Sequence, residues 1–214
     1  MRKRKVITRS GARVRGYFWS YKSRKSIPWE SPLERKALLV LDSDPRIASI
    51  EDYQLETEIE DGREGFIAYP DFLVHNVDGS SEIVEVKCDA ALEDNEVRCR
   101  LNLVEAHFRR LGVSYRVMAE VEICRQPRLK NLETLATYRR PGLATVLAGD
   151  ASVKALLKLS SSTTLGYVAS RLGNMARAHQ LIANGLLHAD LETPLELWSR
   201  ITIGQEVRRD AIPN

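Results

Sequence analysis

The chain has 214 residues, of which 43% are hydrophobic and 29% charged, proportions typical of a globular protein with one or two domains. No apolar run approaches the roughly 18–20 residues that span a bilayer, and the basic start lacks the apolar segment of a secretory signal. The three cysteines have no metal-ligand spacing, which favours a reducing compartment. We therefore expect a cytoplasmic protein without a membrane partner.

The net charge of +3 is an average over two unlike parts of the chain. Residues 1–25 contain ten of the 32 Lys and Arg side chains, whereas all 29 Asp and Glu side chains come later. Such asymmetry predicts a polyanionic partner. Aromatic side chains between Tyr17 and Tyr21 are interleaved with the charges, and their faces can stack on bases. We predict a basic arm over 1–25 that contacts DNA; a solubilising tail or targeting signal is the alternative. The candidate DNA contacts are Arg13, Arg15, Lys22, Arg24 and Lys25.

The first expected element is a helix from Ser31 to about Asp44. Ser31 suits the N-cap, Pro32 suits the first helical position, and Glu34 completes a capping box. Alternation and helical periodicity then predict strands and helices that give an αβββαβ order, typical of an α/β domain. The segments are 46–60 (one or two short strands), 66–76, 81–88, 92–111 and 114–123, with a further helix over 128–138.

A break at Arg139–Gly142 predicts two domains, over 1–142 and 143–214. Three short helices, a Gly turn and a strand pair in the second domain describe a winged helix-turn-helix. Its segments are 153–159, 164–172, 175–187, 188–191 and 199–203. Arg171 and Arg177 are its candidate DNA contacts, and docking of a protein is the open alternative. Trp198 is expected in the core of this domain, and Cys88 is expected to be a buried thiol.

The most informative residues are Pro70–Asp71 and, after 13 intervening residues, Glu85–Val86–Lys87. Glu85 and Lys87 lie two apart on a predicted strand and so share a face, and a hairpin brings Asp71 beside them. Carboxylates hold the hard Mg²⁺ ion that assists phosphodiester hydrolysis, and a nearby Lys stabilises charge or orients water. The spacing predicts a metal-dependent nuclease. The alternative is a solvated Glu-x-Lys pair with an Asp that only begins a strand.

Glu34 has two interpretations that can coexist. As the third residue of the helix it completes a capping box, which is a sufficient structural explanation. As the acid on the first helix of an αβββαβ nuclease, it would also reach the metal site.

The residues around this motif resemble the TnsA family, the endonuclease subunits of heteromeric, Tn-seven-like transposases. The similarity covers about Arg15 to Arg140. The segments that carry it are Arg15–Lys22, Trp29–Arg35, Leu41–Pro45, Gln54, Tyr69–Val74, Glu85–Lys87 and, more weakly, Asn131–Leu135.

The resemblance implies a restriction-endonuclease-like α/β domain, with a mixed sheet flanked by helices, followed by a C-terminal winged-helix domain. It implies Mg²⁺, with Mn²⁺ as a substitute, and cleavage at the 5′ strand ends of a mobile element. The implied partners are transposon-end DNA, a TnsB-like transposase and a TnsC-like AAA+ regulator that meets the C-terminal domain, in the bacterial nucleoid. The implied catalytic residues are Glu34, Asp71, Glu85 and Lys87, and the implied metal ligands are Glu34, Asp71, Glu85 and the Val86 carbonyl. The rival functions are a stand-alone restriction or repair endonuclease and a non-catalytic DNA-binding adaptor.

Overall fold

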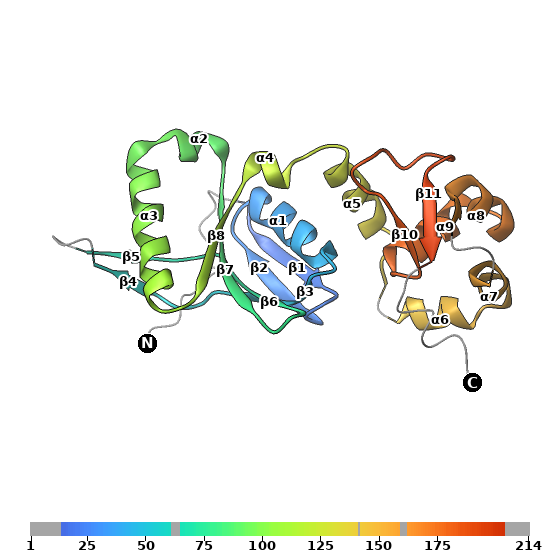
Figure 1. Ribbon diagram of the computed structural model, residues 1–214, viewed down its shortest axis with the longest axis horizontal. Helices are drawn as coiled ribbons and strands as arrows, with labels where there is room; N and C mark the ends of the chain where they lie inside the picture. The colour runs from blue at the N-terminus through green and yellow to red at the C-terminus, as the bar shows by residue number, and fades with distance from the viewer. Residues whose placement is uncertain (1–13, 61–64, 141, 159–161, 204–214) are drawn as a thin grey trace. The chain divides into compact units, whose positions relative to one another are not determined.

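The computed structural model describes residues 14–60, 65–140, 142–158 and 162–203. Arg13, the rest of the arm before it, and most of the expected turn after Glu60 lie outside the described residues. Chain contacts divide the protein into two compact units, unit 1 over Met1–Arg125 and unit 2 over Gln126–Asn214 (Figure 1). The sequence-based boundary at 142–143 falls inside unit 2, because the helix after Pro127 packs on a later helix of that unit.

Unit 1 is an α/β domain. Strands β3, β6, β7 and β8 form a mixed sheet in that order, in which only the β7–β8 pair is parallel. Hairpins β1–β2 and β4–β5 are separate two-stranded sheets. The expected α/β class and mixed sheet are thereby confirmed. The elements are β1 (Gly16–Ser20), β2 (Lys25–Trp29), α1 (Pro32–Ser43), β3 (Ile47–Asp52), β4 (Thr57–Ile59), β5 (Phe66–Ala68), β6 (Phe72–Asn76), β7 (Ser81–Lys87), α2 (Asp89–Glu93), α3 (Asn95–Arg110), β8 (Ser114–Ala119) and α4 (Glu120–Ile123).

Two apolar layers cover the two faces of the mixed sheet, which lies between α1 and α3 (Figure 1). On one face, Leu38 of α1 is buried with Val84 and Val86 of β7. On the other face, Phe108 of α3 is buried with Ile83 of β7. Burying each such side chain contributes about 1.5–3 kcal/mol. Strand β7 is therefore enclosed from both sides, and this enclosure decides the environment of its charged residues.

Three boundaries in unit 1 differ from those predicted. The single strand expected over 66–76 is split into β5 and β6, because Pro70 cannot donate a ladder hydrogen bond. The helix expected over 92–111 is preceded by α2, because the side chain of Asp94 caps a new helix at Glu96 and Val97. The strand expected over 114–123 ends at Ala119, where α4 begins.

The described part of the predicted arm forms the β1–β2 hairpin, which the sequence analysis missed. Its inward side chains Phe18, Ile27 and Trp29 pack on the core beside α1. Trp29 lies opposite Gly16, where a Cβ atom would come within 2.6 Å of the indole ring. From Gly16 onward this stretch is therefore a folded and docked ribbon instead of an arm.

Unit 2 combines helices with a small antiparallel sheet of order β10-β11-β9. Helix α6 and strand β9 were not predicted. The core includes Leu165, Leu181 and Ile201, whereas Trp198 is 75% exposed, so its predicted burial is wrong. The predicted burial of Cys88 in unit 1 is also wrong, because that thiol is exposed. The elements are α5 (Arg128–Ala136), α6 (Leu143–Gly149), α7 (Ala151–Leu157), β9 (Ser162–Thr164), α8 (Leu165–Leu172), α9 (Met175–Ala183), β10 (Leu187–Ala189) and β11 (Arg200–Ile203). None of the described helices has the length and apolar character needed to cross a membrane.

Candidate active site

Asp71 lies at the junction of Pro70 and β6, directly beside β7. Its backbone N–H donates to the Val84 carbonyl at 3.2 Å, and the Val86 N–H donates to its Oδ2 at 2.7 Å. Phe72 pairs with Val84, so continuing the register by one residue sets Asp71 opposite Glu85. The split between β5 and β6 thus leaves the Asp71 side chain just before β6, beside the inner strand β7 of the sheet.

Glu85 and Lys87 share the face of β7 that points away from Val84 and Val86, and their side chains form an ion pair. Glu85 is only 9% exposed, and Lys87 is partly buried. On the same face of the sheet, Ile83 is packed against Val104 and Phe108 of α3. The burial of Glu85 argues against the alternative in which Glu85 and Lys87 form a solvated surface pair.

Glu34 is the third residue of α1 and takes part in its cap. The Ser31 hydroxyl accepts from the Glu34 N–H at 3.1 Å, and the Glu30 N–H donates to Glu34 Oε2 at 2.6 Å. The reciprocal bond of the predicted capping box thus comes from Glu30, one residue before the N-cap. Helix α1 packs on β7, so its first turn brings the Glu34 carboxylate within electrostatic range of Asp71.

The four side chains form one electrostatic cluster. Burial raises the pKa of Asp71 well above its ordinary value, and the Glu85 and Glu34 carboxylates raise it further. Burial disfavours the Lys87 ammonium, but the Glu85, Asp71 and Glu34 charges outweigh burial and raise the pKa of Lys87. Burial, then Glu85 and Asp71, also raise the pKa of Tyr115 on β8, whose buried hydroxyl has no hydrogen-bond partner. Such shifts are typical of functional sites.

The donor set of this cluster suits a hard divalent cation in its chemistry. Three carboxylates offer the oxygen ligands that Mg²⁺ prefers. Within the described ranges, however, no three Asp, Glu, His or Cys side chains are arranged to surround an ion. Instead Glu85 contacts Lys87, Asp71 accepts from Val86, and Glu34 accepts from Glu30. Metal binding would therefore require these side chains to come closer together.

The predicted DNA contacts of the hairpin have different surroundings. Lys22 Nζ donates to the Ile47 carbonyl at 2.5 Å, and Lys25 pairs with Glu51 at 3.4 Å. Arg15 is half-buried, and its Nε is buried without a hydrogen-bond partner. Arg24 is exposed at the turn with a φ of 52°, which is uncommon for a residue with a side chain. Lys22 and Lys25 thus have structural contacts besides any role with DNA.

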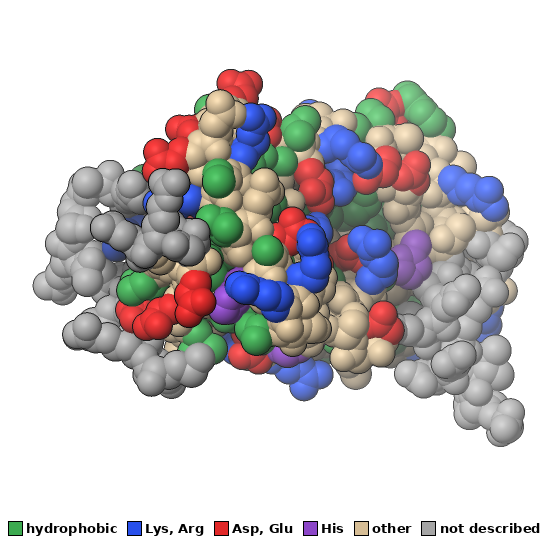
Figure 2. Space-filling model, turned by 60° about the vertical axis from the view of Figure 1, so that its left-hand side comes forward, with side chains coloured by type: hydrophobic (Ala, Val, Ile, Leu, Met, Phe, Trp, Pro, Cys, Tyr) green, Lys and Arg blue, Asp and Glu red, His purple; other side chains and the backbone are tan. Residues whose placement is uncertain are grey.

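The two predicted contacts of unit 2 also differ from each other. Arg177 pairs with Asp150 at 2.7 Å, and Asp150 in turn caps α7. Hydrogen bonds from Ser152 and then Arg177 lower the pKa of Asp150. Arg171 is exposed in the last turn of α8. On the face shown in Figure 2, Lys and Arg side chains are interspersed with Asp and Glu side chains.

Asp42 is an important residue that the sequence analysis missed. It is fully buried on α1, where Oδ1 accepts from the Ser20 hydroxyl at 2.6 Å and from the Lys22 N–H at 3.2 Å. Its Oδ2 accepts from the Tyr21 N–H at 3.3 Å. One carboxylate thereby fixes the end of β1 to α1. The available signal was an acid four residues after Leu38, on the apolar face of an amphipathic helix.

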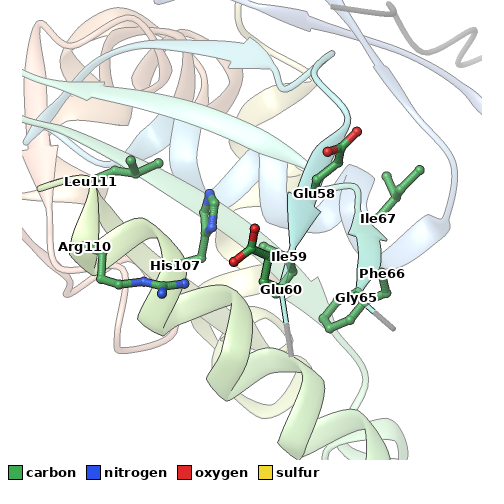
Figure 3. Close-up of a pocket in the computed structure, with 9 residues that line it drawn as sticks. All are labelled: Glu58, Ile59, Glu60, Gly65, Phe66, Ile67, His107, Arg110 and Leu111. Atoms are coloured by element: carbon green, nitrogen blue, oxygen red, sulfur yellow. The ribbon is translucent and has the colours of Figure 1, made fainter. Parts of the chain in front are cut away.

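A hollow of about 580 Å³ lies away from the acidic cluster, between the end of α3 and the β4–β5 hairpin (Figure 3). His107 and Arg110 come from the helix, whereas Glu58 and Glu60 come from the hairpin. None of the four candidate catalytic residues lines it. The chemistry of Asp71 and its neighbours therefore does not use this hollow.

Comparison with known proteins assigns no function to this chain. No family model matches the chain, and no curated protein matches it. The acidic cluster between β6, β7 and α1 is therefore the feature from which a function is inferred.

Proposed function

We propose that the protein is a Mg²⁺-dependent DNA endonuclease and acts as the TnsA-like subunit of a heteromeric transposase, hydrolysing the phosphodiester at the 5′ strand ends of a mobile element. One observation carries the proposal: Asp71, Glu85, Lys87 and Glu34 converge in a single electrostatic cluster in which the pKa of the buried Asp71 carboxyl is strongly raised. Three acids lie within electrostatic range of Lys87, which pairs with Glu85, so the remaining negative charge favours a further cation. A metal-binding function accounts for this acidic cluster, whereas packing alone does not.

Each residue of the cluster has a role in hydrolysis. Asp71 and Glu85 would hold Mg²⁺, with Glu34 and the Val86 carbonyl completing the set. When bound, Mg²⁺ neutralises phosphate charge and lowers the pKa of water. Lys87 keeps its proton, and its ammonium stabilises the charge that develops on the phosphate oxygens. A water oxygen bonds to phosphorus while the bond from phosphorus to the 3′ oxygen breaks, which leaves a 5′-phosphate and a 3′-hydroxyl.

The proposal includes a fold for each of the two units, and the order of elements along the chain supports it. The order α1, β3, β6, β7, α3 and β8 agrees with a restriction-endonuclease-like core. In unit 2, the order α7, β9, α8, α9, β10 and β11, with a sheet of order β10-β11-β9, supports a winged-helix-type domain. We propose that this domain engages the AAA+ regulator or DNA, and that a TnsB-like transposase cuts and joins the 3′ ends.

The test is strand cleavage of DNA carrying element ends, with Mg²⁺ or Mn²⁺, by wild-type protein and by the Asp71→Asn variant, each supplied with its partner transposase. Wild-type protein should cut and Asp71→Asn should not. The matched control is Asp44→Asn, whose carboxylate pairs with the exposed Arg46 and does not belong to the acidic cluster, and this variant should cut normally. Equal cleavage by Asp71→Asn would refute the site. Efficient cleavage at a defined sequence by the protein alone would instead favour a stand-alone nuclease.

A further inference from the structure

The outward face of the β1–β2 hairpin carries two exposed aromatic rings. Tyr17 is 65% exposed and Trp19 is 46% exposed, and both project from the face of β1 opposite to the packed Phe18. The residues opposite them on β2 are Pro28 and Ser26. This face is therefore apolar and aromatic although it lies within the most basic part of the chain.

The hairpin that carries these rings is held firmly in place. Its inward face is packed on the core through Ile27 and Trp29, and Asp42 fixes the end of β1 to α1. Ser23 at the turn exchanges hydrogen bonds of 2.7 Å with the backbone of Ile50. The rings are thus presented to solvent from a rigid ribbon, which lowers the entropy lost when a ligand binds.

We propose that this face, defined by Tyr17 and Trp19, binds the nucleobases of an unpaired DNA strand. Residues two apart on a strand are separated by about 6.7 Å. That backbone spacing is close to two steps of about 3.4 Å along a nucleic-acid strand, so the two rings are attached at intervals that match the spacing of bases. The proposal rests on the proposed function only in taking DNA as the substrate.

The charge around the rings supports a nucleic-acid ligand. Residues 1–25 contain ten basic and no acidic side chains, and four of the basic residues, Arg15, Lys22, Arg24 and Lys25, lie among the described residues of the hairpin. Arg24 is exposed at its tip and can meet the phosphates of a DNA strand. At the tip, Arg24 keeps a left-handed backbone that glycine would adopt without strain. Two exposed rings beside the exposed Arg24 combine the base stacking and backbone attraction of single-strand binding sites.

The alternative of a ribbon inserted into a duplex groove is less well supported. A two-stranded ribbon fits the major groove, but there it recognises base edges with hydrogen-bonding side chains. The outward face consists of Tyr17, Trp19, Ser26 and Pro28. Of these four residues, only Ser26 has a small hydrogen-bonding side chain. Ring faces find partners where bases are unpaired, as at a distorted or opened site of cleavage.

The experiment measures binding of labelled oligo(dT) and of a mixed-sequence duplex to the full chain by fluorescence anisotropy in EDTA. We expect Trp19→Ala and Tyr17→Ala each to weaken oligo(dT) binding about tenfold, with little change for the duplex. Trp19→Phe should restore most of the loss. Trp198→Ala, which removes an exposed indole from unit 2, should bind like wild type.

Salt titrations separate stacking from charge. The aromatic variants should keep the wild-type salt dependence, whereas Arg24→Gly should make it shallower. Equal losses for oligo(dT) and duplex, or wild-type binding by both aromatic variants, would overturn the proposal. The binding assay contains EDTA and so does not depend on metal-dependent cleavage. Loss of DNA binding by the hairpin and loss of cleavage at Asp71 can therefore be observed independently of each other.

Discussion

Replacing Asp42 by Ala removes the carboxylate that fixes the hairpin to α1. The bond from the fully buried Ser20 hydroxyl is charge-assisted and contributes about 1.5–3 kcal/mol. The Tyr21 and Lys22 N–H groups are part-buried, and each bond contributes about 0.5–1.5 kcal/mol. Relief of the desolvation of the carboxylate offsets part of this loss. We therefore expect Asp42→Ala to lower the free energy of unfolding by about 3 kcal/mol.

The assay is urea unfolding followed by tryptophan fluorescence in a Trp198→Phe background. The two remaining tryptophans, Trp19 and Trp29, both lie on the hairpin, so the signal reports its release. With a urea dependence of about 1–3 kcal/mol per M, the midpoint should fall by about 1–3 M. Asp42→Asn keeps an acceptor for Ser20 and should lose less. A midpoint shift for Asp42→Ala no larger than that of Asp44→Ala, which breaks the ion pair with the exposed Arg46, would refute the reasoning.

Two further predictions concern Gly16 and Asp71. Gly16→Ala should destabilise the hairpin by about 1–3 kcal/mol, because the new Cβ meets the Trp29 ring at 2.6 Å. The control is Gly149→Ala, whose new Cβ meets nothing within 4 Å. Equal effects of the two substitutions in urea unfolding would argue against the close packing of Gly16 on Trp29. The raised pKa of Asp71 stabilises the metal-free protein below the unfolded pKa of about 4, and this stability is lost as pH rises through the folded pKa. Asp71→Asn should therefore be more stable than wild type at neutral pH in EDTA but not at pH 3; an equal difference at both would contradict the shift.

The local parts of the site were predictable from sequence. The spacing of Asp71, Glu85 and Lys87 determines a hairpin register, and the structure has that register, since Phe72 pairs with Val84 and places Asp71 opposite Glu85. The capping role of Glu34 likewise depends on neighbours within one helical turn. Such features are fixed by short-range geometry.

Features that depend on distant packing were not predictable in the same way. The burial of Glu85 depends on the tertiary packing around β7, which the alternation along that strand does not reveal. The docking of β1–β2 depends on Asp42, and the density of basic residues around Gly16–Ser20 obscured an alternation that predicts a strand. The winged-helix expectation placed Trp198 in the core, but its exposure is set by tertiary contacts that periodicity does not encode.

The central claim is that the acidic cluster exists to hold a divalent metal ion. Calorimetric titration of Mg²⁺, and of Mn²⁺, into the full chain tests it most directly, because the measurement needs neither DNA nor partner proteins. We predict saturable binding to wild-type protein that weakens on acidification, as protons compete for Asp71. Asp71→Asn should lose this binding, and Asp44→Asn should retain it. No saturable heat with wild-type protein, or unchanged binding by Asp71→Asn, would contradict the account.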